Sequence, residues 1–207
     1  MNTMIPFKKN RREFLKTMAI GASGFAVGSM LIQPQAAFSQ FAEDNLAKIP
    51  METRWAFTSG GFVYLKISED KALFDKVGEK KYNEINRKNG LASGARNKKH
   101  AENFGFIGHD AKSLAAMATA LVTMYYGPKE QFEFVNATSE KSLVRSLNCA
   151  YWDTLQARKI KDDTCSTWSQ SWWEGFITAM NPKLTLKLVK ARPWGDAVCE
   201  WVIEYKA

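Results

Sequence analysis

The residues of this 207-residue chain best suited to chemistry are a cysteine and two tryptophans at helical spacing. Cys165, Trp168 and Trp172 are spaced i, i+3 and i+7, which places them along one stripe of a helix predicted from about residue 165 to 180. Six of the seven tryptophans lie between residues 152 and 201. For any single tryptophan the favoured interpretation is a place in the hydrophobic core. A thiol beside two indoles would also line a pocket for a flat or sulfur-bearing small molecule.

A cysteine nucleophile needs a base within hydrogen-bond reach, and that base is normally a histidine. The chain has two histidines, His100 and His109. His109 directly precedes a helix predicted from residue 110 to 126, whereas His100 lies in a lysine-flanked stretch expected at the surface. The candidate catalytic group is therefore Cys165 or Cys199 as the thiol, with His109 moving the proton. The alternative is that His109 simply begins the helix.

The three cysteines predict neither a metal site nor a disulfide-built scaffold. No Cys-x-x-Cys pair occurs, and two histidines are too few for a zinc-ligand cluster. An odd number of cysteines allows at most one intramolecular disulfide and leaves one thiol over. Unpaired cysteines are usually small buried hydrophobes, and Cys199, which alternates along a strand with Trp201 and Ile203, fits that interpretation. We therefore expect no metal.

Short motifs in the C-terminal half occur in a recognisable order. They are Gly108-His109-Asp110-Ala111-Lys112-Ser113, Asn148-Cys149, Cys165 opening a helix, Asn181-Pro182, and Gly195-Asp196-Ala197-Val198-Cys199-Glu200-Trp201. From His109 to Tyr205 this order resembles the L-2-amino-thiazoline-4-carboxylic acid hydrolase family. Ala150 stands where that family has a proline after the first cysteine, and Trp168 lies in a helix where a second cysteine is expected. A similar closing motif occurs in vinyl-reductase-like small-molecule-binding domains.

The resemblance implies a cofactor-independent hydrolase that acts on a small cyclic C–N or C–S compound. A thiolate would attack an amidine-like carbon of this small-molecule substrate, a histidine would move the proton, and indole rings would hold the substrate ring. The catalytic residues on this interpretation are Cys165, Cys199 and His109. The substrate-binding residues are Trp168, Trp172 and Asp196.

Two alternatives from other functional classes stay open. One is a non-catalytic domain of the vinyl-reductase-like type, which binds a small molecule and uses its cysteines only for packing. The other is an accessory subunit of an exported oxidoreductase, in which exposed aromatic surface contacts a partner subunit or a second copy. Thiol reactivity separates the first two hypotheses, because a reactive cysteine of low pKa favours the enzyme and three inert thiols favour the binder.

Residues 1–39 have the features of a twin-arginine export signal. Arg11-Arg12-Glu13-Phe14-Leu15-Lys16 matches the twin-arginine pattern, and Ala37-Phe38-Ser39 offers small residues to a signal peptidase. The apolar stretch from residue 17 to 32 is interrupted by glycines and is short for a membrane helix. We therefore expect the twin-arginine translocase as a partner during export, a periplasmic location and no membrane span after cleavage. An uncleaved N-terminal anchor is the alternative.

The charge of the chain does not require a nucleic-acid partner. The signal contains five basic residues and one acidic residue, which account for half of the formal net charge of +8. The other lysines and arginines are scattered apart from a short run at residues 96–100. We therefore expect no nucleic-acid binding.

Residues 40–207 are expected to form a single α+β domain, with an antiparallel sheet packed against several helices. A leader segment is predicted over residues 40–58, a short strand or the lead into a helix over 61–67, a helix over 71–88, and a break at Gly90, Ser93 and Gly94. The remaining predicted elements are helices 110–126, 150–159 and 165–180 and strands 131–135, 143–147, 184–188 and 199–205, the last two forming a hairpin with its turn at 194–196.

Overall fold

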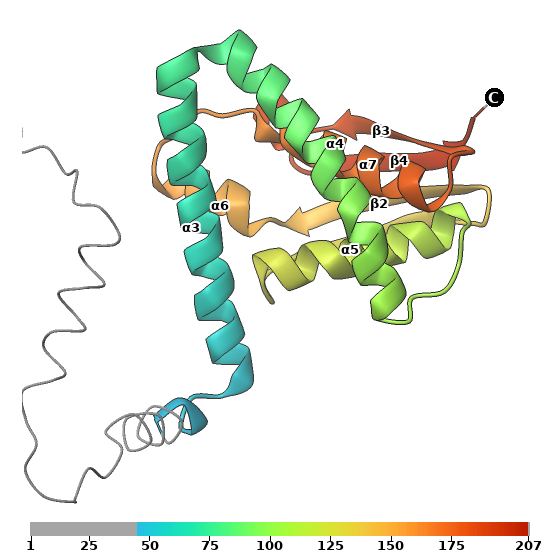
Figure 1. Ribbon diagram of the computed structural model, residues 1–207, viewed down its shortest axis with the longest axis horizontal. Coiled ribbons are helices and arrows are strands. Elements are labelled where there is room, and N and C mark those ends of the chain that lie inside the picture. Colours follow the sequence, from blue (N-terminus) through green and yellow to red (C-terminus); the bar gives the residue numbers. More distant parts are fainter. Residues whose placement is uncertain (1–44, 207) are drawn as a thin grey trace, which may run out of the picture. The chain divides into compact units, whose positions relative to one another are not determined.

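The computed structural model describes residues 45–206. Residues 45–48 make a helical turn in which the Lys48 amide donates to the Asn45 carbonyl at 3.2 Å. The rest of the described chain belongs to one compact unit, Ile49–Ala207. In this unit helices cover a four-stranded antiparallel sheet, which confirms the predicted α+β class (Figure 1).

The export signal predicted for residues 1–39 lies outside the described residues. Between residues 45 and 206, no helix is both long enough and apolar enough to span a membrane.

The first half of the unit consists of three helices. They are α3 (Met51–Val77), α4 (Glu79–Asn103) and α5 (Ala111–Tyr126). The junction of α3 and α4 is Gly78, whose φ of 75° is readily adopted only by glycine. The single helix predicted over residues 71–88 is therefore two helices. The leader predicted over residues 40–58 is wrong from residue 51 onward, where α3 begins, and residues 61–67 are helical.

Helix α4 runs without interruption through Gly90, Ser93 and Gly94, where the sequence predicted a break. The glycines are there because helix α7 (Gln170–Met180) crosses α4 at close range. A Cβ atom added at Gly94 would lie 2.0 Å from the backbone oxygen of Trp172. Glycine at these positions is a packing requirement and does not end the helix.

The second half of the unit carries the sheet. Its strands are β1 (Gln131–Ala137), β2 (Lys141–Asn148), β3 (Leu184–Lys190) and β4 (Cys199–Tyr205). They are arranged in the order β1-β2-β4-β3, and every adjacent pair is antiparallel. The four predicted strands are confirmed, as is the closing hairpin. The segments between strands form helix α6 (Ala150–Ala157), a π-helix η1 (Cys165–Ser169) that leads into α7, and a 3-10 turn η2 (Arg192–Trp194).

The core lies between one face of the sheet and helices α5 and α7 (Figure 1). The rings of Trp173 from α7 and Trp201 from β4 stack at 5.3 Å with an interplanar angle of 16°. Helix α5 begins as predicted, with the Asp110 carboxylate accepting the Ser113 amide at 2.9 Å, and Leu114 on its first turn is fully buried. Helix α3 packs outside this layer, against α5 and α6.

The α4–α7 crossing gives a direct test of packing. We expect Gly94→Ala to lower the free energy of unfolding by about 2 kcal/mol, because the added methyl group has to displace backbone. Gly60→Ala is the matched control in α3, since a Cβ atom at Gly60 meets nothing within 4 Å. This control is expected to raise the free energy by up to about 1 kcal/mol through helix propensity. Urea unfolding followed by circular dichroism measures both, and a Gly94→Ala protein as stable as wild type would contradict the packing argument.

Candidate functional site

A small chamber of about 50 Å³ lies between the sheet and the helices that cover it. Its walls come from helices α5, α6, η1 and α7, from strands β1, β2 and β4, and from the segments that join α5 to β1, β2 to α6 and α6 to η1. Among the residues that line it are Glu130, Phe132, Ser146, Cys149, Cys165 and Trp201. A space of this size holds a few water-sized groups.

Strand register explains how these side chains meet. On the helix-facing side of the sheet, Phe132 of β1 lies opposite Ser146 of β2, which lies opposite Cys199 of β4. The next row on the same side pairs Val144 with Trp201. Because side chains alternate along a strand, Cys199 and Trp201 share this face. The chamber therefore lies over two adjacent rows of the sheet.

The π-helix η1 supplies the wall that faces the sheet. Its wider turn is closed by the Gln170 amide, which donates to the Cys165 carbonyl five residues earlier. Single π-turns inside helices are frequent at functional sites. Here the turn brings Cys165, Trp168 and Ser169 to the same cavity wall.

A larger pocket of about 330 Å³ adjoins the chamber, between α3, α4, α5 and the η1–α7 segment. Val122, Tyr126, Trp168, Ser169 and Trp173 line both spaces, so the two cavities are adjacent and share a wall. The outer pocket is mostly aromatic, since its other residues include Phe62, Tyr125 and Trp172.

The one cation among the residues that line the outer pocket is Lys66 of α3. Its ammonium group lies 4.6 Å from the centre of the Trp168 ring and is paired with the Asp70 carboxylate. Lys66 therefore positions the Trp168 indole, and its charge is already partly neutralised.

The segment that leads into η1 is held by buried polar groups. The Tyr151 hydroxyl donates to Asp70 Oδ2 at 2.9 Å, and the Asp162 carboxylate accepts from Thr164 and, at 3.3 Å, from the Tyr82 hydroxyl. Burial raises the pKa of Asp162. This network ties α3, α4 and α6 to residues 162–164, directly before Cys165.

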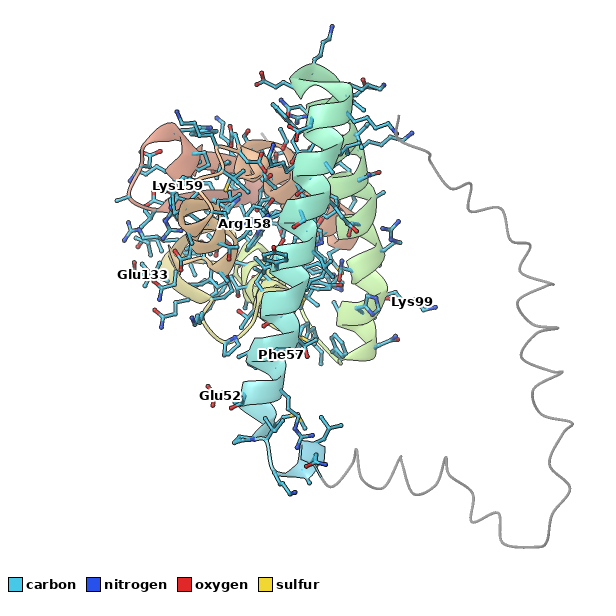
Figure 2. All side chains as sticks on the ribbon, turned by 90° about the vertical axis from the view of Figure 1, so that its left-hand side faces the viewer. Glu52, Phe57, Lys99, Glu133, Arg158 and Lys159 are labelled. Atoms are coloured by element: carbon cyan, nitrogen blue, oxygen red, sulfur yellow. The ribbon has the colours of Figure 1, made fainter. Side chains whose placement is uncertain are left out.

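The end of α6 is attached to α3 close to this network. The Arg158 guanidinium lies 4.5 Å over the Tyr64 ring and donates to the Ser68 hydroxyl at 3.2 Å. Figure 2 shows Arg158 beside α3. The start of the segment that approaches η1 is therefore fixed as well.

The three cysteines are free thiols in unlike surroundings. The Cys199 sulfur accepts the Arg192 amide at 3.4 Å and a hydrogen bond from the Cys165 thiol. The Cys165 bond, helped by that amide and the Arg192 charge, lowers the pKa of Cys199 to about 7. The same bond raises the pKa of Cys165. Cys149 caps α6 by accepting the Trp152 amide at 3.5 Å, and burial raises its pKa to about 12.

A carboxyl group and a guanidinium lie beside the thiols. Glu130 is only 7% exposed and accepts the Ala150 amide at 2.6 Å, and burial raises its pKa to about 7. Arg192 donates through Nη2 to the carbonyls of Ser146 and Leu147, at 3.2 and 2.6 Å. Its Nη1 atom is buried and has no hydrogen-bond partner within residues 45–206.

The sequence-predicted site residues divide into two groups. The structure places Cys165 at the chamber, Trp172 at the outer pocket and Trp168 at both, and a hydrogen bond joins Cys199 to Cys165. It does not bring His109 to the thiols. His109 is exposed before the first turn of α5, about 20 Å along that helix from Val122 at the chamber.

The remaining predicted residue, Asp196, lies in the β3–β4 turn. Its carboxylate accepts the Ala191 amide at 2.9 Å, and it lines neither of the two cavities described above. Its visible role is therefore to shape the turn that carries Arg192.

Sequence reasoning missed Glu130, Arg192 and Lys66. Glu130 lies in the short joint between a helix and a strand, where no periodicity marks a side chain as buried. The proline after Arg192 marks a turn without indicating that the arginine folds inward. Lys66 lies in a segment predicted as either a strand or the lead into a helix. Only in a helix is it next to Asp70, four residues later, so the sequence does not predict this ion pair.

Comparisons with known proteins support the fold and leave the family open. No family model matches the chain, and no curated protein does. Among solved structures, the chain is similar to the phenol-responsive sensory domain of the transcription activator PoxR with phenol, with a TM-score of 0.53 and 14% identity over 71% of this chain and 74% of that one. It is also similar to a trafficking protein particle complex subunit 3 from Naegleria fowleri covalently bound to palmitic acid, with a TM-score of 0.53 and 12% identity over 73% of this chain and 96% of that one.

Glu130 makes stability depend on pH. The folded state keeps this proton up to about pH 7, whereas the unfolded chain releases it near pH 4.5. The free energy of unfolding therefore falls as pH rises through this window, by about 3 kcal/mol at most. Glu130→Gln keeps the oxygen that accepts the Ala150 amide and is expected to remove this contribution. Glu52→Gln, at the start of α3 (Figure 2), is the control. Urea unfolding at several pH values measures the effect, and parallel profiles for wild type and Glu130→Gln would exclude it.

Proposed function

We propose that this domain binds a small, largely apolar molecule with a planar ring in the outer pocket, with one end directed toward the chamber. The observation that carries the proposal is the aromatic lining of the outer pocket, which shares five lining residues with the adjacent chamber, three of them aromatic. The outer volume of about 330 Å³ lies at the lower end of the range of small-molecule sites. Aromatic walls favour a planar ring, because rings stack on indoles.

The two similar structures support a binding role. One is described with phenol and the other with covalently bound palmitic acid, so both are known with a largely apolar ligand. The identities of 14% and 12% do not carry the ligand over to this chain. If residues 1–39 act as the predicted export signal, the binding would take place in the periplasm.

A pocket-filling substitution tests the proposal. Val122 of α5 lies where the two spaces meet, so Val122→Trp is expected to fill the junction and weaken binding about tenfold or more. Met124→Trp places the same side chain on the exposed part of α5 and is the matched control. Isothermal titration calorimetry with phenol, 1-naphthol and toluene measures affinity, and circular dichroism checks folding. Absence of binding to all three by wild type, or equal affinity in both variants, would overturn the proposal.

A thiol hydrolase, as implied by the sequence resemblance, is the second candidate function. The observation that favours it is the pair of hydrogen-bonded thiols at the chamber, of which Cys199 accepts two hydrogen bonds. Two donors stabilise a thiolate, which is the nucleophilic form of cysteine. With His109 at the far end of α5, Glu130 is the group near the thiols that would accept a proton.

The hydrolase proposal is tested with 2-amino-thiazoline-4-carboxylate as substrate and chromatographic detection of the product. Cys165→Ser and Cys199→Ser are each expected to lower turnover about a hundredfold or more, because each removes one partner of the thiol pair. Cys149→Ser, at the cap of α6, is the control and should retain turnover. No turnover by wild type, or the same turnover in all three variants, would exclude this chemistry.

A further inference from the structure

Binding of a small molecule in the outer pocket leaves the thiols of the chamber without a role. Cys165 lines the chamber and packs against the core cluster that contains Cys199. Cys199 is 3% exposed and lies opposite Ser146 of the chamber wall, and a hydrogen bond between the two thiols shifts their pKa values in opposite directions. The two residues belong to η1 and β4 and are separated by more than thirty positions along the chain. Two sulfur atoms in contact across the core are the reactants of a disulfide.

Cys149 is held differently, although it lines the same chamber. Its sulfur accepts the Trp152 amide at the start of α6, and neither of the other two thiols is hydrogen-bonded to it. The structure therefore separates the three cysteines into a contacting pair and a third thiol engaged by α6.

We propose that Cys165 and Cys199 are a modification site, a dithiol that a peroxide converts into a disulfide joining η1 to β4. The Cys165 sulfur faces the chamber, so it meets the oxidant first. Cys199 first loses its proton to water, the Cys165 proton then passes along the hydrogen bond to the Cys199 sulfur, and the Cys165 thiolate attacks one peroxide oxygen. The O–O bond breaks, leaving a sulfenic acid on Cys165 and a hydroxide ion.

Cys199 completes the reaction. Its sulfur attacks the Cys165 sulfur, the S–O bond breaks and a second hydroxide ion leaves. The two hydroxide ions take up the two thiol protons, so that two thiols and hydrogen peroxide become one disulfide and two molecules of water. Both electrons lost by the sulfur atoms are taken up by the peroxide oxygens.

The size of the chamber determines which oxidant is effective. A space of about 50 Å³ admits a molecule close to water in size, and hydrogen peroxide meets that limit. A peptide disulfide such as oxidised glutathione is far larger. Thiol–disulfide exchange requires the Cys165 sulfur to reach a sulfur atom of the oxidant. We therefore expect oxidised glutathione to oxidise the pair at least about tenfold more slowly than hydrogen peroxide does.

The positive charge beside the pair favours the anionic intermediates. The Arg192 amide donates to Cys199, and the guanidinium of the same residue keeps one nitrogen unpaired near the thiols. A single negative charge shared between two sulfur atoms is therefore stabilised at this end of the chamber, whereas Cys149 lies by the buried carboxyl group of Glu130.

The experiment treats the full chain with hydrogen peroxide, denatures it, blocks the remaining thiols with N-ethylmaleimide and maps the peptides by mass spectrometry without reduction. We expect two of the three thiols to resist alkylation and the Cys165 and Cys199 peptides to be joined, with the loss of two hydrogen atoms. A parallel sample treated with oxidised glutathione at the same concentration should react about tenfold more slowly. Cys149→Ser, the control variant, is expected to form the same bridge as wild type.

Three results would overturn the proposal. They are alkylation of all three cysteines after peroxide treatment, a bridge that contains Cys149, and equal rates with peroxide and oxidised glutathione. Peptide mapping of the wild-type protein decides the first two, so the test does not depend on the folding of a variant at the buried Cys199. It is also independent of ligand binding, because no ligand is present.

Discussion

The close crossing of α4 and α7 is the contact on which the site depends. A Cβ atom at Gly94 would lie 2.0 Å from the Trp172 carbonyl, and one at Gly175 would lie 2.2 Å from the Leu91 carbonyl. Glycines on both helices thus let two backbones approach more closely than side chains would allow. Helix α7 packs against α4 on one side and against the sheet on the other, where Trp173 stacks on Trp201. Since η1 continues directly into α7, the positions of Cys165 and Trp168 follow from this crossing.

The other end of η1 is fixed by polar contacts, which are unusual in a protein interior. Asp70 and Asp162 are buried or half-buried carboxylates, and burying such groups is costly unless they are hydrogen-bonded. Tyr82, Tyr151 and Thr164 supply those hydrogen bonds. Helix η1 is therefore held by backbone packing on one side and by a hydrogen-bond network on the other. A π-turn, whose geometry is less favourable than that of an α-turn, is stable between such constraints.

The sequence predicts those parts of the site that depend on regular spacing of residues along a helix or a strand. The spacing of Cys165, Trp168 and Trp172 placed them on one face, and the alternation in β4 placed Cys199 and Trp201 together. What depends on three dimensions was not predicted. The pattern at Gly90 and Gly94 predicts a break in the helix, because a glycine at a helix crossing and a glycine at a break look the same in one sequence. The inward position of Glu130 comes from the fold around a short joint, which no local pattern encodes.

The contrast between Cys199 and Cys149 shows how little is needed to give two thiols opposite character. Both are largely buried, and each accepts one backbone amide, from Arg192 and from Trp152. Burial alone raises the pKa of a thiol, as it does for Cys149. Cys199 differs by having a second thiol, Cys165, as a donor, and its pKa falls to about 7. The strand register places Cys199 beside Cys165 of η1, whereas Cys149 lies at the start of α6. This difference in neighbours accounts for the opposite shifts of the two pKa values. A slip of one residue in β4 would turn Cys199 to the opposite face of the sheet and leave Cys165 without a partner.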